Sequence, residues 1–135
     1  MKRTLLALLF CLMAAGAAPA QDRPCRPARH AKLPAVKGSA YHRARKMLLA
    51  AGWRPSRTKP RDVAADDPDI SYGNGRLFWR RGYTEVESCS GTGVAACAFL
   101  FEDAHGNRLR VTTAGEELPR RKAYAAVTGF RFVCE

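Results

Sequence analysis

The sequence predicts a small α+β domain, with one N-terminal helix packed on an antiparallel β-meander of four to five strands and disulfide bonds holding it together. One clear helical pattern stands near the start of the domain, and alternating or apolar segments separated by turn residues follow it. A helix followed by consecutive strands is typical of the α+β class. Four cysteines outside an N-terminal leader predict the disulfides.

The first element is a secretory signal peptide, predicted over residues 1–20. A basic start at Lys2 and Arg3 precedes an apolar run from Leu5 to Ala15, and Ala18–Ala20 matches the small-x-small pattern before a cleavage site. The apolar run is too short to span a bilayer. Export to the periplasm or the medium is therefore expected.

Cleavage leaves about 115 residues, the size of one small domain. The Pro- and Arg-rich residues 21–33 are predicted to form an extended arm, and residues 34–135 a single α+β domain. No other apolar segment approaches the length of a membrane-spanning helix, so we expect no transmembrane segment in the mature chain.

The cysteines outside the leader predict two disulfides. Four cysteines allow three pairings, and we favour Cys89–Cys97, which closes a short loop, together with Cys25–Cys134, which joins the two ends of the chain. A zinc site is the alternative. It is weaker, because the chain has no C-x-x-C pair and an oxidising compartment favours disulfides.

The helix is predicted over residues 39–52. Ser39 is a suitable N-cap, and Gly52 stands where a left-handed residue ends a helix. Pro55 prevents continuation. The predicted buried stripe has helical spacing and comprises Tyr41, Ala44, Leu48 and Ala51.

The rest of the domain is predicted to be strand and loop. Residues 53–58 form a short strand, and residues 59–75 form a long loop rich in Pro, Gly and Asp. Its aspartates lack the spacing of a calcium loop, so we interpret them as turn and capping residues. From Arg76 the pattern is β, with segments 76–80, 83–89, 95–102, 108–113 and 126–134.

The residues Pro34-x-Val36-x-Gly38, followed by Ala44, Leu48 and Gly52-Trp53, resemble the opening of a PASTA domain. The resemblance covers residues 34–53. The PASTA-like opening implies a cell-envelope module associated with peptidoglycan fragments. The second half and the cysteines depart from the family pattern. Residues 82–116 also resemble a recurring segment of small uncharacterised proteobacterial periplasmic proteins, which implies no activity.

The charge of the chain favours an anionic partner. The formal net charge is +11, and about +9 remains without the leader. The candidate binding surface is a basic patch with one aromatic residue, made of Arg43, Arg45, Lys46, Trp53, Arg54 and Arg57. The alternative is that Trp53 belongs to the core and the charges are solvated. Nucleic acid is not an expected partner of an exported protein.

The sequence does not predict an enzyme, a cofactor or a metal site. His30, His42 and His105 have no companion at metal-ligand spacing, and each is interpreted as solvent-exposed. Glu85 and Glu87 are predicted to share one strand face, where two carboxylates can act as acid and base. The alternative is that they pair with Arg108 and Arg110 on a solvated face.

Two functions follow from these observations. The first is a non-catalytic exported binding module of the cell envelope, whose ligand is peptidoglycan or another anionic surface. The second is a protein-binding inhibitor or immunity protein against an exported enzyme, a role that suits a small domain with disulfides. The oligomeric state stays open.

Overall fold

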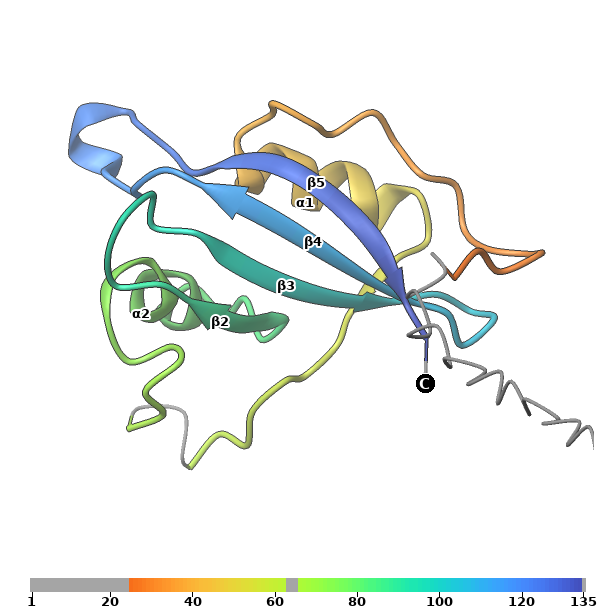
Figure 1. Cartoon of the computed structure of the whole chain (residues 1–135), viewed down its shortest axis with the longest axis horizontal. Coiled ribbons are helices and arrows are strands. Elements are labelled where there is room, and N and C mark those ends of the chain that lie inside the picture. Colours follow the sequence, from red (N-terminus) through yellow and green to blue (C-terminus); the bar gives the residue numbers. More distant parts are fainter. Residues whose placement is uncertain (1–24, 63–65, 135) are drawn as a thin grey trace, which may run out of the picture.

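The computed structural model describes residues 25–62 and 66–134, which form an α+β domain with a five-stranded antiparallel sheet (Figure 1). The signal peptide predicted for residues 1–20 lies outside the described residues. The elements, in order, are α1 (Tyr41–Ala50), β1 (Arg54–Pro55), α2 (Gly73–Arg80), β2 (Val86–Cys89), β3 (Cys97–Glu102), β4 (Arg108–Ala114), a 3-10 turn η1 (Pro119–Arg121) and β5 (Ala126–Val133).

The predicted meander is confirmed as β2, β3, β4 and β5, which pair in sequence order. Strands β1 and β2 both pair with β3, and β4 pairs with β3 along its whole length. The two short strands therefore share the remaining edge of β3, with β1 beside its last residues and β2 beside its first. Figure 1 shows β2, β3, β4 and β5 as a curved sheet, to which the two-residue strand β1 adds at the edge of β3.

Both helices pack on one face of this sheet. Alternate residues of β3 and β4 are buried, and the rings of Tyr41 from α1 and Phe78 from α2 lie 3.6 Å and 5.0 Å from the ring of Phe99 on β3. Burial of these apolar side chains is the main force that holds the helices on the sheet. The core includes Leu48, Trp53, Phe78, Val86, Phe99, Phe101, Leu109 and Val111.

The predicted first helix is confirmed as α1, but its cap differs. Tyr41, Ala44 and Leu48 form the buried stripe, and Gly52 has a φ of +97°. The N-cap position belongs to Ala40 rather than to Ser39, and no side chain caps it. The Ser39 carbonyl accepts a hydrogen bond from the Val127 N–H at 2.9 Å. Residue 39 is held by β5, so the helix begins later.

The strand predicted over residues 76–80 is wrong, because these residues belong to α2. Buried Asn74, Gly75 and Phe78 lie on one side of that helix, at helical spacing. Gly75 allows a close approach, since a Cβ there would lie 2.7 Å from the Cα of Ile70. A short run of large apolar residues does not by itself distinguish a helix from a strand.

The favoured cysteine pairing is confirmed. Cys25 is bonded to Cys134, and Cys89 is bonded to Cys97 across the β2–β3 pair. The described part of the arm, residues 25–33, is extended and held along its length. The Trp53 indole donates to the Lys32 carbonyl at 2.9 Å, and Ala31 and Leu33 pack against the core.

Asp103 joins this arm to the turn between β3 and β4. Its carboxylate accepts hydrogen bonds from the backbone N–H groups of Ala31, His105 and Asn107 at 2.8–2.9 Å, and from the Asn107 side chain. Burial alone would raise the pKa of Asp103, but these hydrogen bonds outweigh it and lower the pKa to about 2.

Replacing Asp103 with alanine is expected to lower the free energy of unfolding by about 2–3 kcal/mol, because three partly buried N–H groups and the Asn107 side chain lose a charged acceptor. The folded-state pKa lies below the usual 3.8, so the carboxylate stabilises the fold fully above about pH 4 and progressively less as the pH falls toward 2. Urea unfolding of both proteins between these pH values tests this. A stability difference that does not shrink in acid would contradict it.

Candidate ligand-binding surface

The face of the sheet opposite the helices carries a concentration of arginines. We call it the open sheet face. Register places its side chains in rows across the strands: Arg54 beside Glu102 and Arg108, and Leu100 beside Arg110 and Arg131. Paired residues in adjacent strands project to the same side of a sheet, so strands far apart in the sequence bring these arginines together.

Two adjoining clefts lie on this face, with volumes of about 540 Å³ and 780 Å³. Both are lined by Arg57, Leu100 and Arg108, so these residues separate one cleft from the other. Arg57 is positioned by its neighbours. The Ser56 N–H donates to the Leu100 carbonyl at 3.0 Å, and the Thr58 N–H donates to the Thr84 carbonyl at 3.1 Å.

Some charges of this face are compensated within the protein. Arg110 donates two hydrogen bonds of 2.7 Å to Glu87, and these raise the pKa of Arg110. Lys59 lies 3.1 Å from the carboxylates of both Asp67 and Asp69. The Asp69 N–H donates to Asp67 Oδ1, as the turn interpretation of this loop expects.

Other charges of this face are available to a ligand. Arg54, Arg57 and Arg131 are exposed and make no side-chain hydrogen bond or ion pair within the part of the chain that the structure describes. A guanidinium group binds carboxylate and phosphate groups through paired hydrogen bonds. The open sheet face therefore presents an excess of positive charge in the geometry of a shallow anion-binding surface.

The structure divides the basic patch that the sequence predicts. Arg54 and Arg57 line the clefts of the open sheet face. Arg43 and Lys46 are exposed on α1, which packs against the opposite face of the sheet. Trp53 is only 1 % exposed and is part of the core, so it does not lie among exposed arginines. The core alternative is therefore the observed one for Trp53.

Arg45 is part of a polar network between α1 and β2. Its Nε donates to Glu85 Oε1 at 2.5 Å, and Tyr41 donates to the same oxygen at 2.9 Å. The guanidinium carbon lies 4.3 Å from the centroid of the Tyr83 ring, a cation–π contact. Glu85 is completely buried, so Arg45 forms an ion pair with a residue in the interior of the protein.

The pKa directions agree with this arrangement. Burial raises the pKa of Tyr41 well above its usual value, and the neighbouring Glu85 carboxylate adds to the effect. Burial alone would lower the pKa of Arg45, but the hydrogen bonds and charge of Glu85 raise it. Tyr41 is thus a hydrogen-bond donor, and Arg45 is a permanent cation.

His42 extends the network toward the connection between β4 and β5. Its Nδ1 lies 3.0 Å from the Tyr83 hydroxyl oxygen, and its Nε2 lies 2.8 Å from Glu117 Oε2. Glu117 is buried and also accepts from the Ala125 N–H at 3.0 Å. The expected solvent exposure of His42 is therefore wrong, because its side chain is only 18 % exposed and both ring nitrogens have partners.

The two carboxylates that the sequence places on one strand face are separated. Strand β2 begins at Val86, and its register with β3 shifts between Val86 and Ser88. This irregularity leaves Glu85 inside the protein and Glu87 on the open sheet face. Glu87 pairs with Arg110, as the structural alternative expects, whereas Glu85 pairs with Arg45 on another element.

Sequence reasoning did not single out Arg131 as a site residue, and it treated Arg108 and Arg110 only as partners of the two glutamates. Their alternation with Leu109 and Val111 indicates that the two arginines share a face. Which strands lie on either side of these two arginines depends on how the strands pair in the folded sheet. The register between β4 and β5 adds Arg131 to this row.

Within the described residues, no group of three His, Cys, Asp or Glu side chains is arranged to hold a metal ion. No helix among these residues has the length and apolar character needed to cross a membrane. A scan against protein-family models, a search of curated proteins and a search of solved structures each returned no match.

Proposed function

We propose that the protein is a non-catalytic binding module exported to the cell envelope, and that it binds an extended anionic ligand on the open sheet face. The observation that carries the proposal is the alignment of five arginines on that face, three of them without a partner in the described chain. The five are Arg54, Arg57, Arg108, Arg110 and Arg131, and the three without a partner in the described chain are Arg54, Arg57 and Arg131.

Two further observations support this proposal. The two disulfides suit an oxidising compartment outside the cytoplasm, as the leader predicted over residues 1–20 also does. The PASTA-like residues 34–53 suggest peptidoglycan as the envelope ligand, and the carboxylates of its peptide stems would suit arginines. The ligand class is accordingly an envelope polymer with repeated carboxylate or phosphate groups.

Neutralising the three unpartnered arginines tests the site. The triple variant Arg54→Gln, Arg57→Gln and Arg131→Gln is expected to bind isolated peptidoglycan about tenfold more weakly at ~0.15 M salt, since each lost contact of an exposed charge contributes roughly 0.2–1 kcal/mol. Lipopolysaccharide vesicles in a parallel arm distinguish a phosphate-bearing source from a carboxylate-bearing one.

The matched control neutralises three exposed basic residues elsewhere, Arg43→Gln, Lys46→Gln and Arg120→Gln, with the same change in net charge. This control is expected to retain the binding of the unaltered protein. Equal losses in the two triple variants would show a non-specific effect of net charge and contradict the assignment of the open sheet face.

A second candidate function is a protein-binding inhibitor or immunity protein against an exported enzyme. The observation that favours it is the outer edge of β5, which lies beside a groove and which, beyond Val127, no described segment of the chain pairs with. Co-purification of one stoichiometric protein partner with the disulfide-bonded protein tests this candidate. The side chains that line the groove indicate which kind of partner segment it would bind.

A further inference from the structure

Within residues 25–62 and 66–134, the outer edge of β5 has no backbone partner over most of its length. β5 is the last strand in the sheet order, with β4 on one side only. At its start, the outer edge is occupied by the loop before α1, where the Gly38 N–H donates to the Val127 carbonyl at 2.8 Å. From Thr128 to Val133, no backbone hydrogen bond from residues 25–62 or 66–125 reaches this edge. Free strand edges readily accept another strand.

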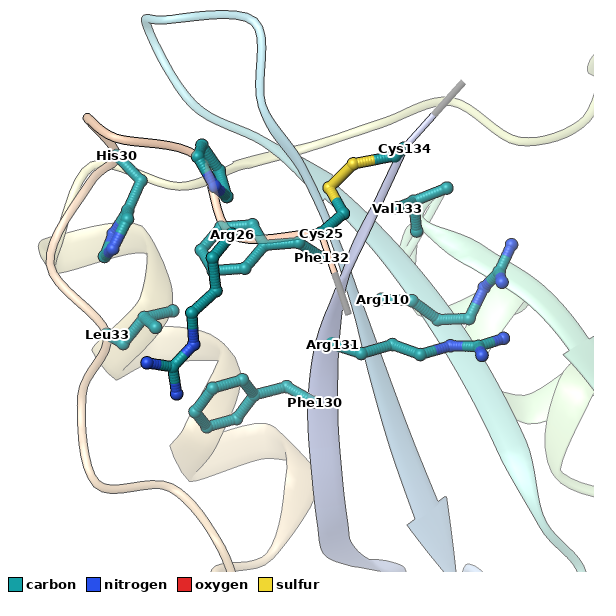
Figure 2. A pocket seen from close by; sticks show the side chains of 11 residues that line it. Cys25, Arg26, His30, Leu33, Arg110, Phe130, Arg131, Phe132, Val133 and Cys134 are labelled. Carbon is teal, nitrogen blue, oxygen red and sulfur yellow. A yellow bond between two sulfur atoms is a disulfide. The ribbon is translucent and has the colours of Figure 1, made fainter. Parts of the chain in front are cut away.

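A groove of about 750 Å³ runs beside this edge, between β5 and the extended arm (Figure 2). Arg26, His30 and Leu33 of the arm line it, and the Cys25–Cys134 disulfide lies at the end where β5 finishes. This disulfide and the hydrogen bonds of Asp103 hold the arm in place. The groove thus has a fixed second wall.

The two sides of β5 differ in chemistry. Phe130 and Phe132 project to one side of the strand, and Arg131 projects to the other, next to Arg110 on β4 (Figure 2). Phe132 contacts the rings of Trp53 and His30, whereas Phe130 is 39 % exposed. A strand added at this edge would meet Phe130 and the Arg26 guanidinium on one face, and Arg131 beside Arg110 on the other (Figure 2).

We infer that the β5 edge binds an extended, acidic segment of another protein by strand addition, with acidic and apolar residues alternating along the segment. Successive side chains of a strand point to opposite faces. The acidic residues would face Arg131, and the apolar residues would face Phe130 and Leu33. Main-chain hydrogen bonds give affinity in this mode, and the alternate side chains give specificity. The inference goes beyond an envelope ligand on the open sheet face and concerns the second candidate function.

Charge complementarity selects an acidic partner over a second copy of this chain. The charged side chains that line the groove are Arg26, Arg131 and Arg110, of which Arg110 is already paired with Glu87, and no Asp or Glu among the described residues lines it. Two copies paired through β5 would bring like-charged arginines close together, which is destabilising. An acidic strand would instead gain favourable pairs along the same edge.

The test uses a synthetic peptide of about eight residues in which glutamate and valine alternate, a common length for a strand. Calorimetry with the disulfide-bonded protein is expected to show binding, and about tenfold weaker binding for a peptide with lysine in place of glutamate. A peptide of equal composition with its glutamates and valines in two blocks is also expected to bind weakly. Equal affinities for the three peptides would overturn the inference.

Methylation of the peptide nitrogens tests strand addition itself. N-methyl groups on every second residue remove the donors along one edge of the peptide, and methylation of the other set removes those along the other edge. One of the two peptides is expected to lose binding while the other retains it. Retention by both, or loss by both, would show that no strand forms at this edge.

Variants of the protein locate the site. Arg131→Gln and Phe130→Ser alter exposed side chains and are each expected to weaken peptide binding about fivefold or more, whereas Arg120→Gln and Tyr72→Ser, also exposed, leave it unchanged. Dimerisation in ultracentrifugation that the peptide does not reverse would assign the edge to a second copy. Arg54 and Arg57 do not line the groove. The effect of Arg54→Gln and Arg57→Gln on peptidoglycan binding therefore tests the open sheet face separately from the β5 edge.

Discussion

Replacing Glu85 with alanine is expected to lower the free energy of unfolding by about 3–5 kcal/mol, because it leaves the Arg45 guanidinium without its partner at the edge of the core. Glu85 is completely buried, whereas the Arg45 side chain is 19 % exposed. Tyr41 also loses the acceptor of its hydroxyl. Urea unfolding followed by tryptophan fluorescence measures the change.

The control for this prediction is Glu87→Ala, two residues away. Glu87 makes a bidentate pair with Arg110, but both side chains are about one quarter exposed. An exposed pair contributes only about 0–1 kcal/mol, because solvent screens the charges. Similar costs for the two variants would mean that burial of Glu85 does not determine its contribution.

The second large effect is expected from the disulfides, which differ greatly in the length of chain that they enclose. The sequence separation is 109 residues for Cys25–Cys134 and 8 residues for Cys89–Cys97. Chain-entropy estimates give about 5 kcal/mol for the long loop and roughly 2.5 kcal/mol for the short one, through restriction of the unfolded chain.

The paired variants Cys25→Ser with Cys134→Ser, and Cys89→Ser with Cys97→Ser, test this order. The first pair is expected to shift the urea midpoint further. It should also release the arm, which makes the backbone amides near Ala31 exchange faster with solvent. A larger shift from the Cys89–Cys97 pair would contradict the entropic account and indicate that strain or local packing at β2 dominates.

The confirmed parts of the fold are those that local patterns encode. Tyr41, Ala44 and Leu48 have helical spacing, and their burial in α1 follows from it. Leu109 and Val111 alternate with polar residues, and β4 buries them on one face. The favoured disulfides followed from chain position, since Cys89 and Cys97 flank a short turn.

The errors in the fold arose where distant contacts decide the conformation. Residues 76–80 hold three large apolar residues in succession, which suit a buried strand as well as a helix. The helix is favoured by the fit of Gly75 against Ile70 and by the hydrogen bonds of Asn74 to Gly115 and Glu117. Position 39 similarly depends on β5 rather than on the local preference of serine.

The candidate site could be predicted only in part. Its overall charge and two members, Arg54 and Arg57, were evident from the sequence. The roles of Arg45 and Trp53 were not, because both residues stand beside exposed basic residues in the chain and yet turn inward in the fold. Proximity in sequence does not specify which side chains share a surface.

By itself, the sequence determined the α+β class, the main helix, the meander and the excess of positive charge, because spacing and composition act over a few residues. Tertiary structure alone decided which arginines face outward together, which glutamate is buried and which strand edge stays open. Strand register and core packing join residues tens of positions apart, and no local pattern in one sequence records those pairings.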